Sequence, residues 1–480
     1  MNFPQLRLIT LLAWAVLALV PIFTARAQLA EGLKATIVAS NAPAADKIPK
    51  LKVTPDRVDW TYALKSQPTI TIRINVTPFP ASGVKITYRL GLERFEGPEI
   101  PAVVKSAGYT LTVQPPAQPG FVRCIVKMVQ QGQIAEETVT VTLGFEPHNI
   151  KPSTAEPADF DNFWRTQMDD LARIEPDFQT ELMSTANSNP RIYQLSFNTL
   201  GVGGIPSRFY GILCIPSGTG PFPALISFPG AGVRAYRGET SRASGSKPAI
   251  TLQMGINGIP VNLPDKNAGT KNELYSDLEV AALGNYVRFN LDDPENFYMR
   301  RVYLGCLRAA QYLILHNQWD NKNFIVTGSS QGGQLALMTA ALFPNEVTGL
   351  AVGVPGFCDT TGFLSSDNNN KRPGGWPSLF SPYSTGTGRN DSPFEKKIAT
   401  IRYYDTVNFA SRITQPGFYW HGYNDDVAAP TCFFAAYNLI KWQEKAQKQL
   451  ILALEAGHTP TMWNQSSRRD AWIQNNIRRN

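Results

Sequence analysis

Phe324-Ile-Val-Thr-Gly-Ser-Ser-Gln-Gly-Gly333 is the stretch that decides the fold class of this chain. Its first four residues are apolar or β-branched and predict a buried strand. The next five fit the pattern G-x-S-x-G, and the helix-forming run from Gly333 to Phe343 follows at once. A strand, a sharp turn and a helix around a serine are typical of a nucleophile elbow. We therefore expect Ser330 to be a nucleophile, with a purely structural turn as the alternative.

Strands and helices alternate on both sides of this motif, from about residue 190 onward. Residues 192–197 and 208–215 predict an antiparallel hairpin, and apolar runs predict a parallel sheet with helices on both faces. We expect its strands at residues 224–228, 249–254, 324–327, 350–354, 417–420 and 450–454. We expect helices near 296–317, 431–446 and 467–478, and an irregular excursion over 255–295. This pattern indicates an α/β fold with its active site at the strand ends.

Residues 28 to about 150 follow a different pattern, with alternating segments at 69–76, 84–90, 109–113, 121–129 and 137–143. Period-two alternation separated by Pro- and Gly-rich turns predicts an N-terminal immunoglobulin-like β-sandwich domain. A polar linker, Lys151–Pro157, and an amphipathic helix from Phe160 follow it. We therefore expect a β-sandwich over 28–150 and a catalytic domain over 151–480. Alternation leaves open whether the β-sandwich binds sugar or supports the enzyme, and we favour support.

Met1–Ala27 has the features of a secretory signal peptide: a basic start at Arg7, an apolar stretch, and small residues at 25 and 27. Its apolar stretch is shorter than the roughly 20 residues that span a bilayer. We therefore expect an exported protein, periplasmic or secreted, without a membrane span once the signal is removed. The five cysteines are scattered and resemble core residues more than a disulfide framework, although one bridge stays open.

The formal charge of +7 arises from 45 basic and 38 acidic residues, without a dense basic run. A mild, dispersed excess of this kind is typical of a solvated surface, so we expect no nucleic-acid partner.

A serine hydroxyl needs a base, and the chain has only four histidines. In α/β-hydrolases the order is serine, acid, histidine, which removes His148 and His316. His421 ends a strand and has no acid well placed before it, whereas His458 lies in the loop after the last expected strand. The order therefore favours His458 as the base.

The acid is expected after a late strand, where residues 422–427 offer two adjacent carboxylates. We favour Asp425 and keep Asp426 as the fallback, with Asp359 as a weaker rival after an earlier strand. For the oxyanion, one backbone N–H should come from Gln331, the residue after the nucleophile. We assign the second donor to Ala231, in the Gly-containing loop after residue 228.

Four stretches, 157–164, 298–309, 328–333 and 422–431, resemble the acetyl xylan esterase / cephalosporin C deacetylase family of carbohydrate esterases, which has the α/β-hydrolase fold. The resemblance extends over about residues 150–475, and the family's triad falls on Ser330, Asp425 and His458. The chain has Pro229-Gly-Ala231 where members commonly have His-Gly-Tyr, and Ala429-Pro430 in place of a Pro-Pro pair. These departures affect the acyl pocket.

The resemblance implies an exported serine esterase that removes acetyl groups from plant polysaccharides or oligosaccharides, without a metal or organic cofactor. Trp420 or Tyr423 could stack on a sugar ring or simply pack. Homo-oligomerisation stays open, because small family members form ring-like hexamers and this chain carries an extra β region. Two alternatives remain: a peptidase of the prolyl-oligopeptidase kind, and a non-catalytic carbohydrate-binding protein on a hydrolase scaffold.

Overall fold

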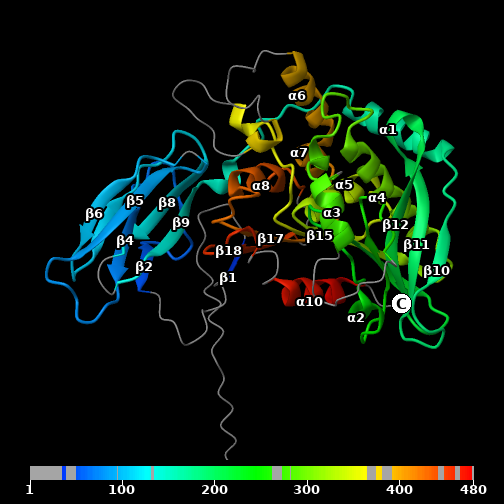
Figure 1. The fold of residues 1–480 in the computed structure, drawn as a ribbon, viewed down its shortest axis with the longest axis horizontal. Coiled ribbons are helices and arrows are strands. Elements are labelled where there is room, and N and C mark those ends of the chain that lie inside the picture. Colours follow the sequence, from blue (N-terminus) through cyan, green and yellow to red (C-terminus); the bar gives the residue numbers. More distant parts are fainter. Residues whose placement is uncertain are drawn as a thin grey trace, which may run out of the picture.

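The computed structural model describes residues 35–38, 50–94, 96–130, 134–261, 273–281, 283–364, 375–380, 392–441, 448–459 and 465–477. Within these ranges a ten-stranded sheet runs through the larger part of the molecule, and two smaller sheets lie at one side (Figure 1). The signal-like segment Met1–Ala27 lies outside the described residues. No helix in the described ranges is long and apolar enough to span a bilayer.

The large sheet is parallel over most of its width and antiparallel at one end. Its strands, in spatial order, are β1 (Thr36–Val38), β18 (Lys448–Ala453), β17 (Gly417–Gly422), β16 (Gly349–Gly353), β15 (Trp319–Ser329), β13 (Phe222–Phe228), β14 (Ile250–Met254), β12 (Pro206–Ile215), β11 (Arg191–Leu200) and β10 (Gln179–Leu182). The expected hairpin is confirmed as β11 and β12, and all six expected sheet strands are present.

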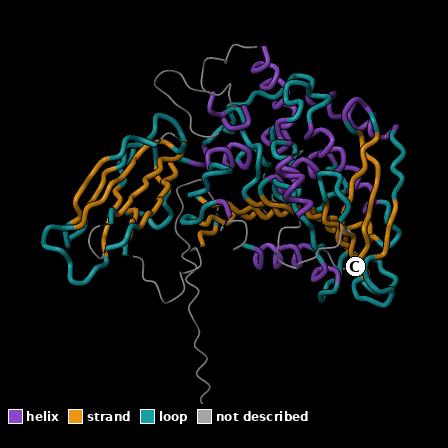
Figure 2. The backbone as a smooth tube through the Cα atoms, viewed as in Figure 1, coloured by secondary structure: helices purple, strands orange, loops and turns teal. Residues whose placement is uncertain are grey.

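The central strands are apolar on both faces because helices cover both faces (Figure 2). Phe324 and Val326 of β15 belong to the main core cluster, whereas Ile325 between them packs into a second cluster with Trp472. Helices α4 and α5 contact the strands on one side, and α10 lies across the other (Figure 1). The helices are α1 (Phe160–Arg173), α2 (Thr240–Ala243), α3 (Glu273–Ala281), α4 (Tyr298–Ile314), α5 (Gln331–Leu342), α6 (Ser392–Tyr404), α7 (Thr406–Ala410), α8 (Pro430–Tyr437) and α10 (Ser466–Asn476).

Two sequence expectations need correction. The helix expected near 431–446 ends at Tyr437, and the next residue, Asn438, donates from its amide to the carbonyls of Pro147 and Ile150, both at 2.9 Å. These bonds tie the residue after the helix to the segment before α1, and residues 442–446 of the expected helix lie outside the described residues. In addition, the stretch 255–295 is not irregular throughout, since its described residues contain α3 and the 3₁₀ turn Tyr286–Arg288.

The N-terminal part forms a three-stranded and a five-stranded sheet, with strand β2 of one in contact with β9 of the other. Their inward residues, such as Ile70, Ile86 and Phe121, are buried and belong to the main core cluster. The first sheet contains β2 (Leu51–Pro55), β4 (Thr69–Ile74) and β7 (Tyr109–Thr112); the second contains β3 (Thr61–Tyr62), β9 (Glu137–Phe145), β8 (Gly120–Met128), β5 (Val84–Leu92) and β6 (Ile100–Val104). Strand β1 precedes all of them in sequence but pairs with β18 of the large sheet. The period-two alternation of the sequence does not indicate that this strand pairs with the large sheet.

Candidate active site

The turn between β15 and α5 holds Ser330 in a strained backbone conformation, with φ 59° and ψ −127°. Its N–H donates to Gly353 O of the next strand at 3.0 Å. The flanking glycines are required by space: a Cβ on Gly332 would lie 2.2 Å from Phe228 O, and one on Gly328 would lie 2.3 Å from the Gly332 carbonyl group. The serine therefore projects from a turn that only this glycine pattern can close.

Ser330, His458 and Asp425 come together at the carboxyl ends of the strands. The Oγ atom of Ser330 lies 3.0 Å from Nε2 of His458, and Nδ1 of the same ring lies 2.8 Å from Oδ2 of Asp425. Asp425 is fully buried and the His458 side chain is 11% exposed. These distances allow a proton to pass from the hydroxyl to the imidazole while the carboxylate fixes the ring tautomer.

The carboxylate of Asp425 is fixed by its own loop. Its second oxygen accepts the backbone N–H groups of Val427 at 2.9 Å and Ala428 at 2.8 Å. The alternative acid Asp426 is exposed and lines a separate cavity. The other rival, Asp359, is buried and its Oδ1 accepts the N–H of Ser153 at 2.7 Å in the linker before α1. Of the three carboxylates, the geometry brings Asp425 to the histidine.

A pocket of about 200 Å³ opens beside Ser330 and is lined by both expected oxyanion donors, Gln331 and Ala231. The loop that carries Ala231 runs close to the elbow: a Cβ on Gly230 would lie 3.9 Å from Cβ of Ser330. The remaining wall is mostly apolar, with Arg288 at one side; it includes Val287, Phe357, Trp376, Leu379 and Val427. The pocket thus places the candidate nucleophile and both expected oxyanion donors around one small, largely apolar space.

Tyr286 is a site residue that the sequence reasoning missed. Its hydroxyl donates to Oε1 of Gln331 at 2.6 Å and accepts the N–H of Gly232 at 3.2 Å. Burial raises its pKa to about 12, so the phenol stays protonated and able to donate. It therefore ties together the two segments that carry the expected oxyanion donors. A tyrosine in a stretch rich in Asn, Gly and Pro carries no periodic signal, which is why the sequence did not reveal it.

The other aromatic and imidazole candidates are core residues. Trp420 and Tyr423 are both buried, and Tyr423 packs edge-on against Phe121 at 5.0 Å. Stacking on a sugar ring is therefore excluded for them, because no ring face is open. His421 is buried with its ring stacked 4.3 Å from that of Phe433, and burial lowers its pKa to about 4. It contributes a neutral ring to the packing next to Asp425 and not a base.

Comparison with known proteins agrees with this geometry. The model of the acetyl xylan esterase family matches residues 143–475. The chain belongs to this family. Acetyl esterase Axe7A from Xylanibacter ruminicola is 30% identical over 421 residues, which cover 85% of this chain and 87% of that protein.

Two solved structures have the same fold as this chain. They are acetyl xylan esterase 1 from Thermoanaerobacterium sp. JW/SL YS485 (TM-score 0.55) and the acetyl xylan esterase from Paenibacillus sp. R4 (TM-score 0.54). Each is 22% identical and covers 69% of this chain and 98% of its own. Family membership makes this chain a serine carboxylic-ester hydrolase with acetyl xylan esterase-like activity.

Proposed function

We propose that the chain is an exported esterase that removes acetyl groups from plant polysaccharides or their oligosaccharides, with Ser330, Asp425 and His458 as its triad. One observation carries the assignment of roles: the continuous contact from Ser330 through His458 to the buried Asp425, at 3.0 and 2.8 Å. Such a chain of groups activates a hydroxyl that is otherwise a poor nucleophile.

In this mechanism Oγ of Ser330 attacks the acetyl carbonyl while Nε2 of His458 takes its proton. The backbone N–H groups of Gln331 and Ala231 stabilise the oxyanion. The tetrahedral intermediate collapses, the C–O bond to the sugar breaks, and His458 returns the proton to the departing sugar oxygen. Water then attacks the acetyl-enzyme by the same route and releases acetate. Asp425 accepts a hydrogen bond from Nδ1–H throughout, and no step requires a metal or organic cofactor.

Two observations support an acetylated carbohydrate as the substrate. The pocket beside Ser330 holds about 200 Å³, enough for a small acyl group and part of a sugar ring. The relative that is similar to this chain in sequence is named an acetyl esterase, and the two solved structures of similar fold are named acetyl xylan esterases.

The domain division is part of the same proposal. Met1–Ala27 acts as the signal peptide, residues 28–150 form an immunoglobulin-like β-sandwich, and residues 151–480 form the catalytic α/β-hydrolase domain. The two N-terminal sheets with a shared core support the sandwich. Export is compatible with the cysteines, whose five buried thiols are free. Sequencing the N-terminus of the secreted protein tests the signal, with Gln28 expected as its first residue.

Acetate release from a panel of acetylated polysaccharides, acetylated xylan among them, tests the function. We expect release by the natural protein and a loss of at least about 10⁴-fold in Ser330→Ala and His458→Ala. Ser329→Ala is the matched control, because it removes the neighbouring hydroxyl of the same turn. Equal release by Ser330→Ala would overturn the mechanism, and cleavage of acyl-peptides without release from any polysaccharide would overturn the substrate class.

A further inference from the structure

The loop that carries Asp425 lies between β17 and α8 and contacts the N-terminal sheets directly. The hydroxyl of Tyr423 lies 3.1 Å from that of Thr61. Nη2 of Arg94, from the turn after β5, donates to Val427 O at 2.7 Å. Both partners are more than 300 positions away in sequence. The loop is therefore bordered on one side by residues that the large sheet does not provide.

Arg123 of β8 makes the contact closest to the triad. Its side chain is 7% exposed, and its Nη2 donates to the backbone carbonyl of Asp425 at 3.0 Å. Since the carboxylate of Asp425 is held by N–H groups of its own loop, the carboxylate moves with that backbone. The backbone of Asp425 is therefore in direct contact with a guanidinium from the N-terminal sheets.

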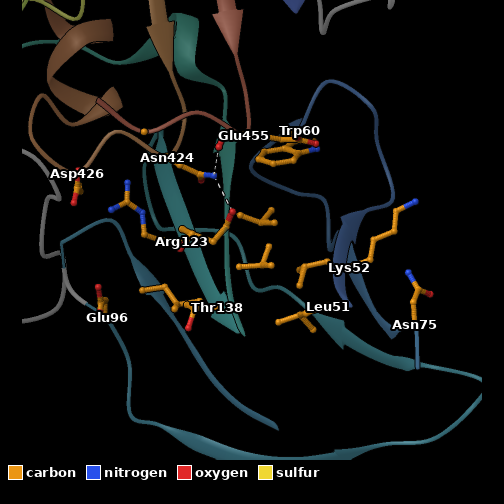
Figure 3. A pocket seen from close by; sticks show the side chains of 16 residues that line it. Leu51, Lys52, Trp60, Asn75, Glu96, Arg123, Thr138, Asn424, Asp426 and Glu455 are labelled. Atoms are coloured by element: carbon orange, nitrogen blue, oxygen red, sulfur yellow. Dashed lines mark hydrogen bonds between the residues drawn. The ribbon is translucent and has the colours of Figure 1, made fainter. Parts of the chain in front are cut away.

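Asn424 extends the connection to the histidine loop. Its amide donates to Thr140 O of β9 at 2.7 Å and to Glu455 O at 3.2 Å. A dashed line in Figure 3 marks the bond to Glu455. Glu455 lies three positions before His458. The amide oxygen accepts from Thr142 Oγ1 at 2.9 Å, and the same hydroxyl accepts from Nε of Arg123 at 3.1 Å. One hydrogen-bonded network thus touches β8, β9 and both loops that carry triad residues.

Solvent reaches this hydrogen-bonded network from one side. A cavity of about 850 Å³ lies between the N-terminal sheets and the loops, with Arg123, Asn424 and Asp426 on its wall (Figure 3). Apolar packing therefore does not enclose the network on that side, and directed hydrogen bonds set how the loops lie against the N-terminal sheets. Neither Arg123 nor Asn424 lines the pocket beside Ser330, so neither is placed to touch the acyl group.

From these contacts we propose that Arg123 and Asn424 are positioning residues of the esterase, through which the N-terminal sheets hold Asp425 and His458 in register with Ser330. The inference rests on the proposed triad. It gives the N-terminal region a part in catalysis that requires no contact with sugar.

Kinetics of Arg123→Met and Asn424→Leu, in the full-length chain, test this. Burial raises the pKa of the Glu93 carboxyl, and the charges of Arg123 and Arg94 oppose that shift, so Glu93 keeps one of its two opposing cations when Arg123 is removed. We expect kcat to fall about 10- to 100-fold with KM within about twofold, because a small displacement of a triad group costs the chemical step and not binding.

Rescue and coupling separate positioning from general damage. Arg123→Lys keeps a donor for the Asp425 carbonyl and should recover most of the lost kcat. The double variant Arg123→Met/Asn424→Leu should lose less than the product of the single losses, because both act through the same loops. Arg89→Met is the matched control: Arg89 lies on β5 of the same sheet, opposite Ile125 of β8, with a side chain 45% exposed. It should leave kcat unchanged.

The outcomes decide between separate claims. A folded Arg123→Met or Asn424→Leu variant with unchanged kcat, or with raised KM alone, overturns the positioning role. If Arg123→Met does not accumulate as folded protein, Asn424→Leu carries the test on the same terms. Full activity of Ser330→Ala would instead overturn the proposed triad, so the two failures are distinguishable.

Discussion

The serine turn and the acid loop hold two parts of one site by opposite means. Ser330 is fixed by its own neighbourhood: the backbone of β15, α5 and β16, and glycines that permit close approach. Asp425 is fixed by its own loop on one side and by residues some 300 positions away on the other. The proposed nucleophile is thus held within the large sheet, whereas the proposed acid also contacts the N-terminal sheets.

This difference predicts where substitutions act. A change in the serine turn should damage folding and catalysis together, because the turn is part of the sheet. A change in the contacts of the acid loop should lower catalysis while the large sheet stays intact. Four further predictions test or sharpen this contrast, from the largest expected effect to the smallest.

Replacing the acid should have the largest effect. Asp425→Asn removes the charge that stabilises the imidazolium and should lower kcat by about 10⁴-fold with little change in unfolding temperature. The matched control is Asp426→Asn, at the adjacent exposed carboxylate, which should stay within about twofold. Steady-state kinetics of both variants are the measurement; a larger loss in Asp426→Asn would reassign the acid.

Gly332→Ala should disrupt the serine turn itself. The added Cβ would lie 2.2 Å from Phe228 O, a backbone atom that cannot move away cheaply. We expect a loss of about 3 kcal/mol or more in the free energy of unfolding, together with activity. Gly203→Ala is the comparison, since that glycine has φ +65° but open space around it and should lose only about 1 kcal/mol. Denaturant unfolding measures both; equal losses would contradict the steric argument.

His421, next to the acid loop, should make stability depend on pH. Burial lowers its pKa to about 4 from an ordinary 6.5, so the unfolded chain binds a proton that the folded chain refuses. The contribution of the neutral His421 ring to the free energy of unfolding is fully present above pH 6.5. It is lost as the pH falls toward 4, by up to about 3 kcal/mol. His421→Gln should remove that part of the acid sensitivity. Urea unfolding at several pH values from 7 to 4 measures the free energy of unfolding of the natural protein and of His421→Gln. The same dependence of that free energy on pH in both proteins would contradict the prediction.

Tyr286→Phe should have the smallest effect. It removes one hydroxyl that joins Gln331 to Gly232 and leaves the ring in place. We expect kcat to fall about 3- to 10-fold, as for loss of one ordinary hydrogen bond. Tyr403→Phe serves as control, since its hydroxyl donates to Oδ1 of Asp159 at 2.7 Å and touches neither the serine turn nor the loop of Ala231. An unchanged kcat in Tyr286→Phe would show that the two oxyanion segments hold their positions unaided.

The same contrast explains what the sequence could predict. The serine turn, the parallel strands and the opening hairpin follow from local periodicity and glycine placement, and the structure contains them all. The order of residues along the chain also pointed to the three groups that the fold brings within hydrogen-bonding distance.

Contacts across long sequence distances were not predictable. Arg123 lies in an alternating strand segment and looks like any outward-facing strand residue, although it is buried against the loop of Asp425. Trp420 is the last residue of a strand that is expected to end at the site, and Tyr423 follows that strand, yet both rings are buried. Strand β1 is only three residues long and precedes a β-rich region, so nothing local assigns it to the large sheet.

The most direct test of the central claim is to trap the acyl-enzyme. The protein is mixed with an activated acetyl ester, quenched in acid within the first turnover, digested and mapped by mass spectrometry. The account predicts one acetyl group on the peptide that contains Ser330, located on that residue by fragmentation and absent in Ser330→Ala. An acetyl group on another residue, or rapid hydrolysis with no acetylated intermediate at any time point, would contradict it.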